Sequence, residues 1–123
     1  MILVDSSVWI DHLRARDEVL SASLADGKVL SHPFVIGEVA LGTIRPREAV
    51  LASLQKLPSA TVAAHGDVMH LIERYRLFGR GIGYIDAHLL AAVRLTPPAM
   101  LWTRDRRLLA VAINLGLAAR LPH

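Results

Sequence analysis

Four carboxylates stand at positions that a purely structural role explains poorly: Asp5, Glu38, Asp86 and Asp105. The other seven of the eleven acidic residues lie beside basic residues, near expected helix starts, on polar faces or in a turn. Asp5 and Asp105 each follow a short apolar run typical of a buried strand, residues 2–4 and 100–103. In open α/β sheets, ligands bind beyond the carboxyl ends of the strands. These two acids therefore stand where a functional site is expected.

Glu38 lies within an expected helix at residues 33–41, and its helical neighbours are apolar residues or glycine. No basic residue occurs within one helical turn on either side. A carboxylate on an apolar face is costly unless something compensates its charge. The alternative is a position at the rim of the core, from which the carboxylate reaches water. We favour a functional role.

The other three acids have structural alternatives. Asp86 stands near the start of an expected helix, residues 84–94, where an acid stabilises the helix dipole. Asp5 and Asp105 could be N-caps, although Ser6 and Ser7 could cap the first helix instead. Taken together, the four acids predict a cluster on one side of the sheet. Such a cluster is untenable without cations.

The expected cluster indicates metal-dependent chemistry. Hard oxygen ligands in a chain without cysteine favour Mg²⁺ or Mn²⁺ over zinc. One or two such ions held by carboxylates suit phosphodiester hydrolysis. A metal-independent ribonuclease would need paired histidines for proton transfer. The six histidines are scattered, and His88 points to another side of its helix than Asp86.

The elements that must position these acids alternate between strands and helices. Strands are expected at residues 2–4, 28–31, 60–62, 100–103 and 117–121, and helices at 8–14, 18–25, 33–41, 46–56, 67–78, 84–94 and 105–115. Residues 79–83 form a glycine-rich connector. This alternation predicts parallel βαβ units with helices on both faces of the sheet. Without an internal repeat or linker, residues 1–123 are expected to form a single domain.

Composition narrows the class of protein. With 53% hydrophobic and 20% charged residues the chain is globular. No apolar run is long enough to span a bilayer and a charge occurs by Asp5, so we expect no membrane segment or signal peptide and a cytoplasmic location. The net charge is +3, and twelve of the fourteen basic residues are arginine, which slightly favours a nucleic-acid partner. The 5% aromatic content argues against a single-strand stacking platform.

The segments around the four acids resemble the acidic motifs of PIN-domain ribonucleases. These segments are residues 1–8, 33–39, 85–91 and 101–108, and their order, spacing and total length resemble most closely the VapC toxins of bacterial toxin–antitoxin modules. The resemblance implies an α/β fold, a three-layer α/β/α sandwich around a parallel sheet of about five strands. It also implies an endoribonuclease that depends on Mg²⁺ or Mn²⁺.

The resemblance assigns roles to individual residues. It implies that Asp5, Asp86 and Asp105 hold the principal metal, and that Glu38 positions a second ion or the attacking water. Hydroxyls that orient carboxylates or metal-bound water are expected from Ser6 and Thr103. Three arginines flank the last acid and could bind the phosphates on either side of the cut: Arg104, Arg106 and Arg107. A second basic cluster contains Arg74, Arg76 and Arg80.

The resemblance also implies partners: an RNA substrate, a small VapB-like antitoxin whose tail blocks the acidic pocket, and a second copy in a homodimer. Alternatives are a PIN-type nuclease of RNA processing that is not a toxin, and a non-catalytic α/β binding or signalling module. A phospho-acceptor receiver domain would need a lysine after the last strand, but none follows Lys56. A haloacid-dehalogenase-type phosphatase would need an acid at Ser7. A module that only binds would leave Glu38 without a physical reason.

Overall fold

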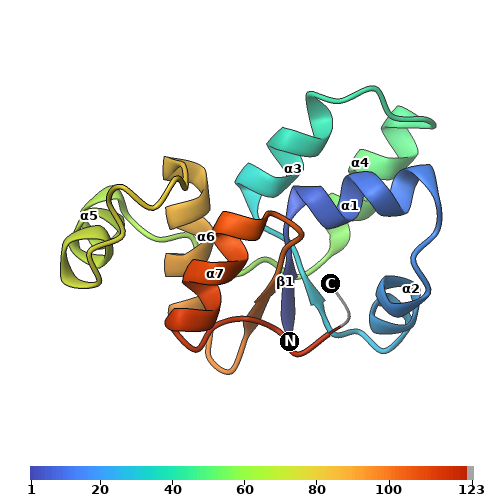
Figure 1. The fold of residues 1–123 in the computed structure, drawn as a ribbon. Helices are drawn as coiled ribbons and strands as arrows, with labels where there is room; N and C mark the ends of the chain where they lie inside the picture. Colours follow the sequence, from blue (N-terminus) through green and yellow to red (C-terminus); the bar gives the residue numbers. More distant parts are fainter. Residues whose placement is uncertain (122–123) are drawn as a thin grey trace.

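A computed structural model describes residues 1–121 of the chain. At its centre lies a parallel sheet of three strands, β1 (Ile2–Val4), β2 (Val29–Leu30) and β3 (Met100–Trp102), in the order β2-β1-β3 (Figure 1). Ile2 pairs with Val29 on one side and with Met100 on the other. Leu3 and Val4 are completely buried, as expected for a central strand. The sheet therefore brings the carboxyl ends of β1 and β3 side by side.

The expected five strands are present only in part. Beyond β2, the outer position holds a single parallel bridge between Ser31 and Ser59, and beyond β3 a single bridge joins Leu101 and Ala118. The predictions of strands at 60–62 and 117–121 were therefore wrong in extent. Near Ser59, Pro58 has no N–H with which to extend the ladder, and Val62 is 48% exposed. The fourth and fifth positions of the sheet are thus single contacts at its edges.

All seven expected helices are present. Their bounds are α1 (Ser6–Arg14), α2 (Glu18–Ala25), α3 (Pro33–Ala40), α4 (Arg47–Lys56), α5 (His65–Arg74), α6 (Tyr84–Arg94) and α7 (Arg106–Asn114). The largest difference from expectation is the end of α5, which stops before residue 75 rather than at 78. Arg76 has a left-handed backbone (φ 54°), a conformation that cannot continue an α-helix.

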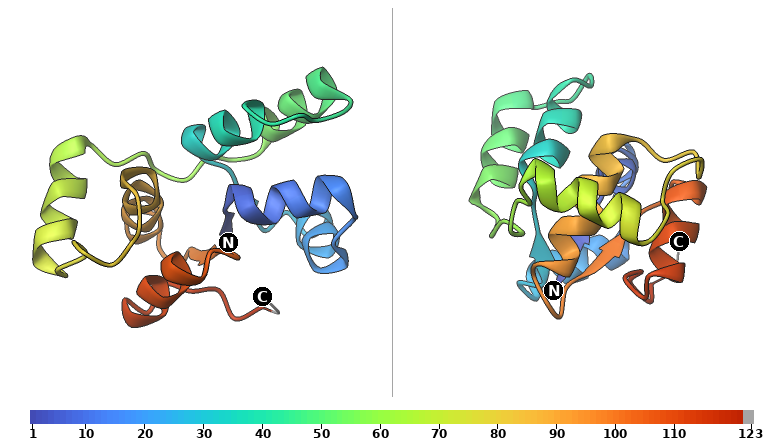
Figure 2. Two further views of the ribbon diagram at one scale, coloured as in Figure 1. Left: turned by 45° about the horizontal axis from the view of Figure 1, so that its top comes forward. Right: turned by 90° about the vertical axis from the view of Figure 1, so that its left-hand side faces the viewer.

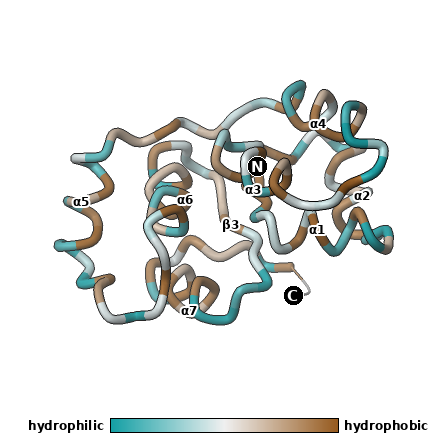
Figure 3. Tube along the Cα trace, turned by 90° about the horizontal axis from the view of Figure 1, so that it is seen from above, coloured by the Kyte–Doolittle hydropathy of each residue, from teal (hydrophilic) through white to brown (hydrophobic). Residues whose placement is uncertain are grey.

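Helices flank the sheet on both sides, with α1 and α2 on one side and α6 and α7 on the other (Figure 2). The inner helix α6 has a continuous buried run from Ala87 to Val93, whereas α5 packs outside it and buries only Val68 and Leu71. Along α5, hydrophobic and hydrophilic residues alternate, as in a helix packed on one side (Figure 3). Among the described residues, no helix has the length and apolarity required to cross a membrane.

Candidate active site

The carboxyl ends of β1 and β3 carry the first and last of the four acids. The backbone N–H of Asp5 donates to the carbonyl of Trp102 (2.9 Å), so the pairing of β1 with β3 extends to the acid itself. Asp105 follows three residues after Trp102, at the N-cap of α7. Asp5 is 5% exposed, which is unusual for a carboxylate and requires polar partners.

Two hydroxyls hold the Asp5 carboxylate. Ser7 Oγ and Thr103 Oγ1 both donate to Asp5 Oδ2, each at 2.8 Å. Asp5 occupies the N-cap position of α1, but its side chain makes no capping hydrogen bond, and both Ser6 and Ser7 lie inside the helix. The capping interpretation of Asp5 therefore fails in this structure. Because both donors bind one oxygen, they fix the orientation of the carboxylate.

Thr103 connects the first acid to the last. Its side chain is completely buried, and its hydroxyl accepts a hydrogen bond from the backbone N–H of Asp105 (3.1 Å) while it donates to Asp5. Ser7 was missed by the sequence interpretation as a partner of Asp5. Its position two residues after the acid was the available signal, since a serine there commonly bonds locally.

Ser6 contacts a different acid from the one it follows in the chain. Its Oγ donates to Glu38 Oε1 at 3.3 Å, and this bond joins the first turn of α1 to α3. The contact places Glu38 beside the start of α1, close to Asp5. Burial is the main cause that raises the pKa of Glu38, the negative charges of Asp5 and Asp86 raise it further, and the bond from Ser6 opposes them. Glu38 is half-buried, so its carboxylate is neither enclosed in the core nor free in solvent.

Asp86 and Asp105 each fill a structural role at a helix start as well. Asp86 Oδ2 accepts from the backbone N–H of Gly83 at 3.0 Å. Asp105 Oδ1 accepts from the N–H groups of Arg107 (2.9 Å) and Leu108 (3.1 Å). Both structural alternatives considered for these acids are therefore real. Each bond uses one oxygen, so it is compatible with a second role for the carboxylate.

The four acids influence one another electrostatically. Burial raises the pKa of Asp86 most, the charges of Asp5 and Asp105 raise it further, and the bond from Gly83 N–H opposes them. No cationic side chain is among the groups that shift the pKa of Glu38 or Asp86. The acids therefore lie near enough to raise one another's pKa values, and a shared metal site stays a prediction.

The arrangement is suited to a hard divalent cation. Within residues 1–121, no three carboxylate or imidazole groups are close enough to hold one ion with the side chains as they stand. The donors are all carboxylate and hydroxyl oxygens, as Mg²⁺ and Mn²⁺ prefer, and Mg²⁺ usually keeps several of its waters. The negative charge of the four acids and their oxygen donors suit a divalent ion that is bound partly through water molecules.

Arg104 differs from the role expected of it. Its guanidinium bridges Asp11 (Nη1 to Oδ2, 2.8 Å) and Asp17 (Nη2 to Oδ2, 2.5 Å) and joins α1 to the start of α2. A contact of Arg104 with substrate phosphates stays a prediction, and the carboxylates of Asp11 and Asp17 would compete with a phosphate for its guanidinium. Arg106 and Arg107 remain exposed in the first turn of α7, next to Asp105.

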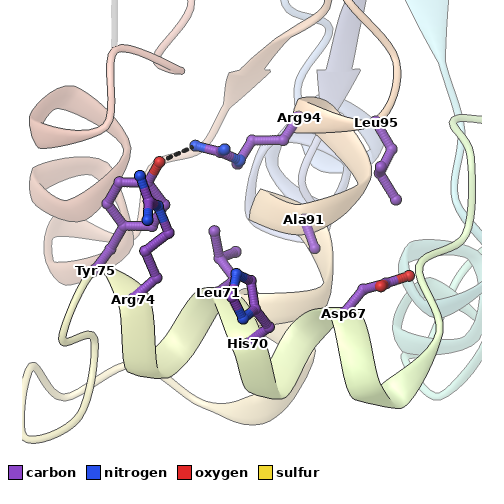
Figure 4. A pocket seen from close by; sticks show the side chains of 8 residues that line it. All are labelled: Asp67, His70, Leu71, Arg74, Tyr75, Ala91, Arg94 and Leu95. Carbon is purple, nitrogen blue, oxygen red and sulfur yellow. Dashed lines mark hydrogen bonds between the residues drawn. The ribbon is translucent and has the colours of Figure 1, made fainter.

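The second basic cluster divides into separate sites. Arg74 lines a pocket of about 270 Å³ between α5 and α6, where Arg94 Nη1 donates to Tyr75 Oη at 2.9 Å (Figure 4). Arg76 instead lies over the ring of Phe78, 5.6 Å from its centroid. Arg74 therefore belongs to the outer α5–α6 surface, whereas Arg76 faces the connector at 79–83.

Comparison with known proteins agrees with this geometry. Residues 2–114 match the PIN domain family. The chain is 50% identical over 118 residues to Ribonuclease VapC32 of Mycobacterium tuberculosis, in the sequences of both strains CDC 1551 and H37Rv. The match covers 96% of this chain and 95% of each relative. The chain belongs to the PIN domain family and, within it, to the VapC ribonucleases.

Proposed function

We propose that this protein is a metal-dependent endoribonuclease that acts as the toxin of a type II toxin–antitoxin system. One observation carries the proposal: Asp5 and Asp86 raise the pKa of Glu38, Asp5 and Asp105 raise the pKa of Asp86, and no cationic side chain of residues 1–121 is among the causes that act on either group. The name of the relatives, Ribonuclease VapC32, supports RNA as the substrate. A role in folding does not explain the cluster, because mutual repulsion of the acids destabilises the folded state.

Asp5, Asp86 and Asp105 are proposed to hold the principal Mg²⁺ or Mn²⁺, directly or through water. Glu38 is proposed to position a second ion or the attacking water. When bound, the metal lowers the pKa of a water molecule and offsets the negative charge at phosphorus. Water attacks the phosphorus in line with the leaving 3′ oxygen, so the products carry a 5′-phosphate and a 3′-hydroxyl.

The hydroxyl groups have positioning roles in this proposal. Ser7 and Thr103 keep the Asp5 carboxylate in one orientation, and Ser6 keeps Glu38 near it. Such support of a metal-binding carboxylate is typically needed for both affinity and activity. Arg106 and Arg107 are proposed to bind phosphates that flank the cut, since both are exposed beside Asp105.

The test compares metal-dependent cleavage by four proteins. Wild type, Asp5→Asn, Asp86→Asn and the control Asp26→Asn, whose exposed acid lies in the turn after α2, are incubated with mixed RNA in Mg²⁺, Mn²⁺ or EDTA. We expect wild type and Asp26→Asn to cleave RNA only with a metal and to leave 5′-phosphates. Asp5→Asn and Asp86→Asn should lose at least a hundredfold in rate. Cleavage in EDTA, or full activity of the two site variants, contradicts the proposal.

The partners proposed are a VapB-like antitoxin and a second copy of the chain, in the cytoplasm. Expression of wild type alone should arrest growth, and co-expression of a small protein encoded next to it should relieve the arrest. Growth arrest by Asp86→Asn to the same extent would show that toxicity does not depend on the acidic site. Absence of arrest together with specific cleavage would favour a PIN-type nuclease of RNA processing.

A further inference from the structure

A small pocket adjoins Asp86 and is not explained by the acidic site. It lies between the end of α5, the connector at 79–83 and the start of α6, and we name it the connector pocket; Leu77, Phe78, Ile82 and Tyr84 are among its lining residues. Its volume is about 200 Å³, below the range of about 300–1,000 Å³ of sites for drug-sized ligands. A pocket of this size suits one planar ring system.

The two most exposed aromatic rings among residues 1–121 both line this pocket. Phe78 is 54% exposed and Tyr84 is 44% exposed, whereas Trp9 and Trp102 are buried. Single exposed apolar residues are common, but two exposed rings that line one pocket form a patch suited to a contact. The low aromatic content excludes an extended stacking platform, but it does not exclude a single stacking position.

The ring of Tyr84 is held firmly. Its hydroxyl is hydrogen-bonded to His65 Nδ1 at the start of α5. Its ring packs edge-to-face on His88, with 4.7 Å between centroids. A ring fixed on two sides loses little conformational entropy when another ring stacks on it. Tyr84 therefore presents a preorganised face at the rim of the connector pocket.

Two arginines lie near the connector pocket. Arg76 lies over the Phe78 ring, and the Arg107 side chain packs so closely on Gly81 that a Cβ there would stand 2.7 Å from Arg107 Cδ. Within residues 1–121, neither arginine forms an ion pair with a carboxylate. An apolar pocket with one arginine over a lining ring and another packed on the neighbouring connector is complementary to a base attached to a phosphate backbone.

The connector pocket adjoins Asp86 through one lining residue, Gly83. Gly83 lines the pocket, and its backbone N–H donates to Asp86 Oδ2. A nucleotide whose phosphate lies at the acids can therefore place a neighbouring base in the pocket. From this arrangement we infer that the connector pocket binds one nucleobase of the RNA next to the scissile phosphate, stacked on Phe78 or Tyr84. The inference rests on the proposed ribonuclease function and adds a determinant of its specificity.

The experiment varies both the ring and the base. Phe78→Leu keeps an apolar side chain without a π face, Phe78→Tyr restores the ring, and Leu41→Ala is a control at an exposed apolar residue outside the pocket. Each protein cleaves a set of oligonucleotides that carry one abasic nucleotide at successive positions around the cut. Stacking of one base on an aromatic side chain contributes roughly a factor of ten in affinity.

For wild type, the KM should rise about tenfold when the abasic nucleotide stands at one particular position, while kcat stays nearly unchanged. For Phe78→Leu, the KM for intact RNA should be raised by the same factor. The abasic nucleotide at that position should raise it no further. Phe78→Tyr and Leu41→Ala should behave like wild type. A second measurement does not depend on cleavage. An oligonucleotide with 2-aminopurine at the same position is bound to the Asp5→Asn variant, and quenching of its fluorescence reports stacking of the base.

The outcomes separate this inference from the proposed function. If wild type cleaves RNA but neither Phe78→Leu nor any abasic position changes KM, the base-binding role is wrong and the ribonuclease stands. If Phe78→Leu weakens only the binding of an antitoxin, the connector pocket receives a protein and the inference is overturned. If wild type cleaves no RNA with either metal and Asp5→Asn quenches no 2-aminopurine, the proposed function is wrong and the base-binding role is wrong with it.

Discussion

Replacement of Thr103 by valine tests whether the hydroxyl between the first and last acids organises the site. Valine has nearly the same shape, so the buried packing of the residue is retained. The variant removes the donor to Asp5 Oδ2 at 2.8 Å and the acceptor for Asp105 N–H at 3.1 Å. We expect a less stable protein and a weaker metal site, because Asp5 loses one of its two hydroxyl donors.

The magnitude follows from these bonds. A hydrogen bond to a charged group contributes about 1.5–3 kcal/mol to stability. Ser7 still donates to the same oxygen of Asp5, so the loss should fall low in the range, at about 1.5–2 kcal/mol. For a chain of this length, such a loss lowers the Tm by roughly 3–10 °C. Loss of a group that orients a metal ligand weakens metal affinity about 10–100-fold.

Thermal unfolding in EDTA and calorimetric titration with Mn²⁺ measure the two effects separately. Thr103→Ser keeps the hydroxyl and should retain most of the metal affinity. Thr43→Val makes the same exchange at an exposed loop position and should change neither quantity. If Thr103→Val matches wild type in both Tm and Mn²⁺ affinity, the hydroxyl does not organise Asp5 and the positioning role is refuted.

Two further predictions concern charge and backbone. Because the folded state raises the pKa values of Glu38 and Asp86 above 4.5 and 3.8, it binds more protons than the unfolded state just above these values. The free energy of unfolding in EDTA should therefore fall as pH rises through this interval, and Asp86→Asn should weaken that fall in denaturant titrations. Gly81→Ala and Gly27→Ala both place alanine at positive φ (78° and 67°), and each should cost about 1 kcal/mol of stability in thermal unfolding. Only Gly81→Ala displaces the Arg107 side chain, so this variant alone should bind RNA more weakly and with a smaller dependence on salt. Equal RNA affinities of Gly81→Ala and Gly27→Ala would contradict a role of Arg107 in binding phosphates.

The central elements of the fold were predictable because their signals are local. The run Ile2–Val4, closed by a polar residue, predicted β1, and Pro33 predicted the start of α3. The edges were not predictable in the same way, since a strand at 60–62 depends on a partner far along the chain. Only Ser59 pairs there. The early end of α5 depends on the left-handed backbone of Arg76, for which arginine gives no sequence signal.

The candidate site shows the same division. The four acids could be singled out from their positions relative to strands and apolar faces, but their partners could not. Ser6 and Ser7 are adjacent in sequence and bond to different acids, because successive residues of a helix point about 100° apart. Arg104 appeared equivalent to Arg106 until the fold placed Asp17 against it. Side chains that reach across elements are determined by tertiary packing, which spacing along the chain does not encode.

The bonds that hold the acids show why the site can exist without depending on metal for its fold. Asp86 and Asp105 are each tied by one oxygen to the backbone of their own helix start, and Asp5 is tied by two hydroxyls. These local bonds offset the repulsion that burial and proximity impose on the carboxylates. Structural zinc sites differ, since there the metal supplies the folding free energy itself. Here a core that includes β1, β3 and the buried run of α6 contributes to that free energy, and the proposed ion would bind carboxylates whose orientation these hydrogen bonds already fix.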